Sequence, residues 1–114
     1  MVAADPLFTV PSKSGREIRL TTTIWRKIET QHPEFKGRSE YLEEIRDAIE
    51  DPDYVVRGWG EGLLAMRWCE RAPARPKHLC VVYRELDGDG FVITAFFIAR
   101  YERLLRRGLL WQRS

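Results

Sequence analysis

The sequence has 114 residues, enough for one domain of ordinary size, and its 44% hydrophobic and 32% charged residues exclude an intrinsically disordered chain. It contains no apolar run near the roughly 20 residues of a membrane-spanning helix. Residues 1–10 lack the basic start and the apolar core of a signal peptide. We therefore expect a cytoplasmic protein that does not enter a membrane.

Charge is distributed unevenly along the chain. Residues 1–57 carry 9 Lys or Arg and 11 Asp or Glu, whereas residues 58–114 carry 10 and 6. Attraction to a polyanion is therefore expected in the second half. Fifteen of the 19 basic residues are arginine, which is the better bidentate phosphate ligand, although a GC-rich genome also produces an arginine excess.

The first fifteen residues predict a lead-in segment, and the next six predict a short edge strand. Residues 1–15 contain two prolines, two serines and a glycine, whereas residues 16–21 alternate polar and apolar side chains. A helix is expected to begin at residues 21–23, because threonine is a good N-cap. It should end near His32, since Pro33 disfavours helical backbone at the residue before it.

A second helix is predicted between Ser39 and Asp51. Ser39 is a suitable N-cap, and acidic residues fill the early turns, where the helix dipole favours them. The apolar residues recur at three- and four-residue spacing, which is typical of one buried helix face. They are Tyr41, Leu42, Ile45, Ala48 and Ile49.

The rest of the chain predicts mainly strands. The candidates are residues 54–57, 63–69, 79–86 and 91–98. The Asp-Gly-Asp-Gly run before Phe91 predicts a hairpin, and the last candidate is apolar on both faces, as in a central strand. A final helix over residues 99–107 is expected to end at Gly108, and residues 109–111 should then fold back onto the body.

Two helices followed by an antiparallel meander predict an α+β fold, with helices on one face of a twisted sheet. Residues 16–114 should form this single domain. Cys69 and Cys80 lack the spacing of a metal site, and a hairpin would place them opposite each other as a reduced pair. Residues 58–60 fit no nucleotide-binding fingerprint. From the cysteine spacing and the lack of this fingerprint, we expect neither a metal nor a cofactor.

His32 and Glu34 are the first candidates for chemistry. His32 lies at the break between the two predicted helices, where it either caps the first helix or serves as a general acid or base, since histidine titrates near neutral pH. Glu34 is either a solvated acid or a second proton-transfer group that also orients His32.

Polar side chains on the predicted strands are the next candidates. Thr94 is the polar residue of an otherwise apolar strand; it either simply suits the strand or aims its hydroxyl at a ligand. Arg67 interrupts a largely apolar strand, so it must be paired or face a solvent cleft that holds a phosphate. Arg84 carries the same two interpretations.

Arg100 begins a basic run that continues through residues 103, 106 and 107. This run is either a solvated helix face or a patch that attracts a polyanion. His78 opens a strand and is expected at the surface.

The order of these elements resembles the phage-associated barnase–EndoU–colicin–RelE-like nucleases, a superfamily of small, metal-independent, ribonuclease-like domains. The matching segments are residues 25–28, 32–34, 49–55, 79–83, 91–96 and 107–111. The resemblance implies N-terminal helices packed on a roughly four-stranded antiparallel sheet, to which the predicted C-terminal helix is added. It does not by itself imply activity, because one fold serves many functions.

A metal-independent ribonuclease needs a base, an acid and cations for the developing charge of the phosphorane. The resemblance implies His32 as the proton-transfer group, Arg67 as the phosphate clamp and Thr94 as a positioning hydroxyl, with Arg84 and Arg100 binding substrate. Glu34 would be the second proton-transfer group.

Two functions follow from these candidates. The first is an RNA-cleaving or RNA-binding domain of phage or mobile-element type, which could act as a toxin. The alternative is a non-catalytic module of the same fold that binds a protein partner. The sequence does not fix an oligomeric state.

Overall fold

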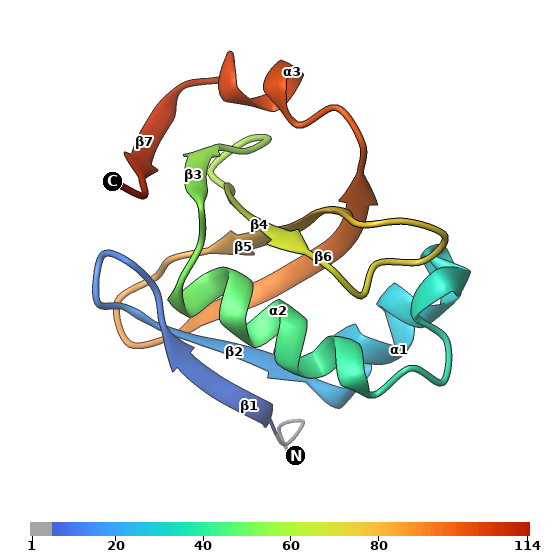
Figure 1. Cartoon of the computed structure of the whole chain (residues 1–114). Helices are drawn as coiled ribbons and strands as arrows, with labels where there is room; N and C mark the ends of the chain where they lie inside the picture. The colour runs from blue at the N-terminus through green and yellow to red at the C-terminus, as the bar shows by residue number, and fades with distance from the viewer. Residues whose placement is uncertain (1–5) are drawn as a thin grey trace.

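In the computed structural model, which describes residues 6–114, seven strands form one mixed sheet (Figure 1). They are β1 (Pro6–Pro11), β2 (Glu17–Thr21), β3 (Tyr54–Arg57), β4 (Leu63–Cys69), β5 (Lys77–Arg84), β6 (Gly90–Ile98) and β7 (Leu109–Gln112). Their order across the sheet is β1-β2-β6-β5-β4-β3-β7.

Four short helices accompany the sheet in the described part of the chain. They are α1 (Thr22–Gln31), the 3₁₀ helix η1 (Pro33–Phe35), α2 (Glu40–Glu50) and α3 (Glu102–Leu105). Figure 1 shows α1 and α2 in front of the sheet, while α3 lies apart from them near β3 and β7. None of these helices has the length and apolar character needed to cross a membrane.

The prediction of a four-stranded antiparallel sheet is wrong. β2 runs parallel to β6, whereas the other paired strands are antiparallel, and the sequence pattern does not predict β1 and β7 as strands. β1 lies inside the expected lead-in segment, with Pro6 and Pro11 at its two ends. Proline has no backbone N–H to donate and is tolerated there because β1 is an edge strand.

β2 pairs with β1 on one side and with β6 on the other, and β6 approaches it closely. The parallel pairing joins Ile18 to Gly90 and Arg19 to Phe91. A Cβ atom on Gly90 would lie 2.5 Å from the Ile18 side chain and 2.7 Å from the Glu17 carbonyl oxygen. Glycine at this position therefore allows the contact that brings the N-terminal hairpin into the sheet.

Each face of the sheet carries its own hydrophobic core. The core under α1 and α2 includes Ile28, Phe35 and Ile45 from the helical segments and Ala65, Val81 and Ala95 from the strands. The core on the other face includes Val56, Leu64, Met66, Cys80 and Val82, and residues of the α3 segment pack against it. Both faces are thus covered, but by different parts of the chain.

The C-terminal helix is shorter than expected. Instead of residues 99–107, α3 covers four residues, and the chain then turns at Gly108, whose φ is +127°. The amide of Arg57 donates to the Gly108 carbonyl at 3.0 Å. This turn lets β7 pair antiparallel with β3, so residues 109–111 fold back onto the body as predicted.

Candidate nucleic-acid interface

The turn between β3 and β4 is a tight glycine-rich loop. The amide of Gly58 donates to the Gly62 carbonyl, and that of Gly62 donates to the Trp59 carbonyl, both at 2.9 Å. A Cβ atom on either of these two glycines would lie 3.0 Å from backbone atoms of the loop, and Gly60 has a φ of +60°. The three glycines therefore hold a compact turn that larger residues would open.

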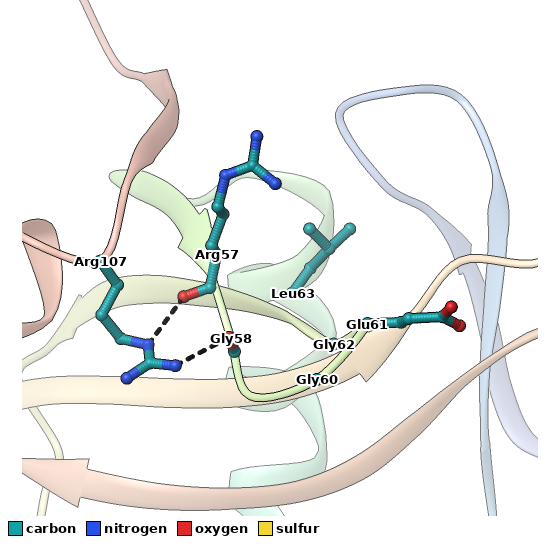
Figure 2. A pocket seen from close by; sticks show the side chains of 7 residues that line it. All are labelled: Arg57, Gly58, Gly60, Glu61, Gly62, Leu63 and Arg107. Atoms are coloured by element: carbon teal, nitrogen blue, oxygen red, sulfur yellow. Dashed lines mark hydrogen bonds between the residues drawn. The ribbon is translucent and has the colours of Figure 1, made fainter.

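Arg107 attaches the C-terminal segment to this turn. Its guanidinium donates from Nε to the Arg57 carbonyl at 3.1 Å and from Nη2 to the Gly58 carbonyl at 2.9 Å, as the dashed lines in Figure 2 show. Arg57, Arg107 and the turn surround a hollow of about 410 Å³. Two arginines from distant parts of the sequence thus lie at one open, polar site.

A third arginine lies next to the same turn. Arg84, at the end of β5, pairs with Glu61, which also lines the hollow. The turn packs against β5, since a Cβ atom on Gly62 would lie 3.6 Å from Val82 Cγ1. The Glu61 carboxylate is therefore balanced by Arg84, and the charges of Arg57 and Arg107 remain in excess.

Thr94 lies on the sheet face opposite α1 and α2. It is paired with Val82, which belongs to the core of that face. Arg84 follows Val82 by two residues and therefore points to the same side of the sheet. The Thr94 hydroxyl is buried without a hydrogen-bond partner among residues 6–114.

His32 lies at the open edge of β6, between the two faces. It ends α1, with its amide donating to the Ile28 carbonyl at 2.8 Å. Its ring centroid lies 6.1 Å from that of Phe96 and 6.4 Å from that of Phe35. Phe96 follows Thr94 by two residues on the same strand face, so the ring that His32 approaches is the next side chain along that face from Thr94.

The structure does not bring Arg67 to this place. Arg67 shares the helix-covered face with Ala65 and Cys69, whereas Thr94 points to the opposite face. Its Nη1 donates to the backbone carbonyl of Asp51 at 2.6 Å and to the Asp51 carboxylate at 3.1 Å. Arg67 thus satisfies a carbonyl group at the end of α2.

Glu34 and Arg100 are both exposed. Glu34 lies in η1, two residues after His32, and Arg100 follows the end of β6 by two residues. Neither forms a side-chain hydrogen bond or ion pair with another residue in the part of the chain that the structure describes.

His78, expected at the surface, is buried in an aromatic cluster. Its side of the sheet also carries Trp68, whose ring centroid lies 5.2 Å away, and its ring lies 4.0 Å from that of Tyr101. Only 8% of the residue is exposed. Burial lowers the pKa of His78, and the weaker opposing effect of nearby Asp53 and Glu102 does not cancel it.

This burial predicts a loss of stability in mild acid. The unfolded chain takes up a proton at His78 near pH 6.5, while the folded chain resists protonation to lower pH. The unfolded state then binds more protons, so the free energy of unfolding should fall as the pH is lowered through and below about 6.5. Urea unfolding at pH 7.5 and pH 5 measures the effect.

His78→Phe is the matched variant for this measurement. It keeps an aromatic ring in the cluster and removes the titrating group, so its unfolding free energy should change less between the two pH values. His32 stays in both proteins and serves as an internal control. An equal change in the two proteins would contradict the assignment to His78.

A comparison with models of known protein families shows the family to which the chain belongs. Residues 3–112 match the model of the family described as phage-Barnase-EndoU-ColicinE5/D-RelE like nuclease 2. The chain belongs to this family. No curated protein and no solved structure matches it. The resemblance deduced from the sequence is thereby confirmed, and the protein is a phage-associated, nuclease-like domain.

The two cysteines of this nuclease-like domain do not face each other. Cys69 is paired with Lys77 and Cys80 with Met66, and the two thiols belong to the cores of opposite sheet faces. Both thiols are free and buried. Burial raises the pKa of Cys69 to about 12, with Glu44 adding to the effect, so this thiol stays protonated at neutral pH.

Within residues 6–114, no group of three or more His, Cys, Asp or Glu side chains is arranged to hold a metal ion. The acidic pair Asp51 and Asp53 is instead occupied by Arg113, at 2.8 and 3.1 Å. Partial burial alone would raise the pKa of Asp51, but hydrogen bonds from Arg113 and Arg67 outweigh it and lower the pKa.

The glycine-rich turn of this nuclease-like domain is the feature that sequence reasoning missed. Its residues were interpretable only as a turn, because Gly58, Gly60 and Gly62 match no phosphate-binding motif. The sequence signal that points to it is Trp59 between two glycines, with Arg57 on the predicted strand before them. The contribution of Arg107 has no local sequence signal, since it depends on the chain reversal at Gly108.

Proposed function

We propose that this nuclease-like domain cleaves RNA without a metal ion, at the edge of β6 where His32 and Thr94 lie. The observation that carries the proposal is the Thr94 hydroxyl, which is buried without a partner among residues 6–114, on the strand face that also carries Phe96, the ring that His32 approaches. A buried hydroxyl without a hydrogen bond costs about 1–3 kcal/mol of stability. A cost of this kind is expected at functional sites.

The proposed chemistry is attack of a ribose 2′-hydroxyl on the neighbouring phosphorus. His32 takes the proton of the attacking hydroxyl, and the bond between phosphorus and the 5′-oxygen breaks. Rotation about χ1 turns the Thr94 hydroxyl toward the phosphate, since the residue itself is partly exposed. The 5′-oxygen takes up a proton from Glu34 or from water.

Arg84 supplies the positive charge in this proposal. It shares the sheet face of Thr94, and because the side chain of its partner Glu61 is 78% exposed, a bound phosphate can replace the Glu61 carboxylate on Arg84. Arg67 has no part in the step because Asp51 occupies its guanidinium on the other face. Arg100, exposed beyond the end of β6, adds to the attraction of the polyanion.

Thr94→Val tests the proposal by opposite effects on activity and stability. The change replaces the hydroxyl with a methyl group of the same shape, so the free energy of unfolding should rise by about 1 kcal/mol. RNA cleavage should fall by about tenfold or more, because one hydrogen bond to the phosphate is lost. Cleavage of a mixed RNA in EDTA and urea unfolding provide the two measurements.

Thr94→Ser is the matched control, since it keeps the hydroxyl and should retain most of the activity. Wild-type activity that depends on added Mg²⁺ would contradict metal independence. Equal cleavage by wild type and Thr94→Val would remove Thr94 from the mechanism.

The edge strand β7 favours a second candidate function, binding of a protein partner. Leu109 and Leu110 are 46% and 47% exposed on this strand, whose outer backbone edge has no neighbouring strand among residues 6–114. An exposed sheet edge can accept a strand from another protein. If this is the sole function, the purified protein will show no salt-dependent RNA binding.

A further inference from the structure

The hollow at the β3–β4 turn combines arginines of two different kinds (Figure 2). Arg107 is held in place by the two backbone carbonyls that it contacts, which leaves Nη1 without a partner among residues 6–114. Arg57 is exposed, and its guanidinium forms no hydrogen bond or ion pair with any other described residue. One guanidinium is therefore fixed, and the other is free to close on a ligand.

The stem of Arg57 is positioned by the backbone beside it. A Cβ atom on Gly108 would lie 3.1 Å from Arg57 Cδ. The absence of a side chain on Gly108 thus leaves a path for the arginine stem along the turn into β7. Figure 2 shows the Arg57 side chain extending away from the Arg107 guanidinium, so Arg57, which helps to line the hollow, has to rotate to bring both cations to one phosphate.

Trp59 extends from the same turn with 52% of its surface exposed. The guanidinium carbon of Arg107 lies over its ring, 4.6 Å from the centroid. This cation–π contact orients the indole and covers one of its faces. A large exposed aromatic ring held beside a positively charged side chain is the arrangement on which a nucleobase stacks in proteins that bind single-stranded nucleic acid.

The charge at this place favours a phosphate. Glu61 is the acidic residue that lines the hollow, and its carboxylate is paired with Arg84. Arg57 and Arg107 therefore provide the net positive charge. The hollow is open to solvent, so a nucleotide of a longer chain can enter it.

We propose that this hollow is a nucleotide subsite for single-stranded RNA, with a base stacked on Trp59 and the adjoining phosphate bound by Arg57 and Arg107. The subsite rests on the proposed RNA-cleaving function and extends it. The subsite lies apart from His32 and Thr94. It is connected to the sheet face of Thr94 by the ion pair between Glu61, which lines the hollow, and Arg84, which lies on that face. Its role is to hold a nucleotide of the same RNA strand at a distance from the one at which the chain is cut.

The test measures binding separately from cleavage. A fluorescently labelled 2′-O-methyl RNA hexamer has no 2′-hydroxyl that can attack, so its affinity reports binding alone. Trp59→Ala should weaken binding about tenfold, which is within the range for loss of one stacked base. Trp59→Phe should recover most of the affinity because it restores an aromatic face.

Trp68→Ala is the matched control. Trp68 is 46% exposed and lies near the other end of β4, away from the turn, so its removal should change affinity less than twofold. Arg57→Ala should reduce the slope of log affinity against log salt by about 0.7, the value for one phosphate contact of a single strand.

The outcomes separate the subsite from the cleavage reaction. If unmodified RNA is cut while Trp59→Ala and Trp68→Ala bind the hexamer equally well, the subsite is wrong and the cleavage proposal stands. If the hexamer binds in a Trp59-dependent way but no RNA is cut, the cleavage proposal is wrong and the hollow is an RNA-binding site. If the wild type does not bind the hexamer, the subsite is wrong, and if it also cuts no RNA, both proposals are wrong.

Discussion

His32→Gln is expected to lower the rate of RNA cleavage by about 10²- to 10⁴-fold, the usual contribution of a positioned general acid or base. Glutamine can still donate and accept hydrogen bonds, but it cannot carry a proton at neutral pH. His32 is the one histidine outside the buried aromatic cluster, and it lies against Phe96 at the open edge of β6. Cleavage of a labelled RNA in EDTA, at saturating substrate, measures the loss.

Binding and folding must be followed in the same variant. Affinity for the 2′-O-methyl hexamer should stay near the wild-type value, since the proposed subsite lies at another turn. Glu34→Gln shows whether the exposed Glu34 supplies the second proton: a loss of similar size would identify it, whereas wild-type activity would assign that step to water. Cleavage by His32→Gln at the wild-type rate would exclude His32 from proton transfer.

The two main helices were predictable because their apolar spacing and most of their ends are coded locally, although the Ser39 side chain makes no capping hydrogen bond at the start of α2. Thr21 Oγ1 accepts a hydrogen bond from the Ile24 amide at 3.3 Å, as expected of an N-cap, and α1 ends just before Pro33. The apolar spacing after Ser39 places α2 within one residue of its observed bounds. These signals lie within a few residues of the structure that they determine.

The sheet was less predictable because its edges depend on distant contacts. The prolines at both ends of β1 favour a loop in isolation, and they are tolerated only because β1 lies at the edge. The parallel pairing of β2 with β6 spans two residues on each strand and requires Gly90. A hydrophobic pattern shows which residues are buried, but it does not show which strands are neighbours.

The arginines show the same limit for the candidate site. Alternation along β4 places Arg67 on an apolar face and requires either a partner or a cleft, but it cannot show that Asp51 is the partner. Arg107 was predicted on a helix end, where its charge suits the dipole. Because α3 ends two residues earlier, its guanidinium instead reaches carbonyls about fifty positions away in the sequence.

Phe35→Ala is expected to reduce the free energy of unfolding by about 3–5 kcal/mol, the range for truncation of a buried phenylalanine. Phe35 has no exposed surface, and its ring stacks on Phe97 at 4.9 Å. The rings of Trp25 and Tyr41 form T-shaped pairs with the same ring, with centroids 6.1 and 5.5 Å from its own. One side chain therefore joins α1, α2 and β6, and its loss leaves a cavity where all three meet.

The same variant should also reduce cleavage under conditions where it is still folded. The Phe35 amide donates to the His32 carbonyl at 3.0 Å, and the two rings are in contact, so Phe35 fixes the end of α1 beside β6. Phe8→Ala is the control of the same residue type, because Phe8 is only partly buried at the sheet edge and should cost less. Urea unfolding measures both variants, and a loss below about 1 kcal/mol for Phe35→Ala would contradict its place as the junction of the helices and the sheet.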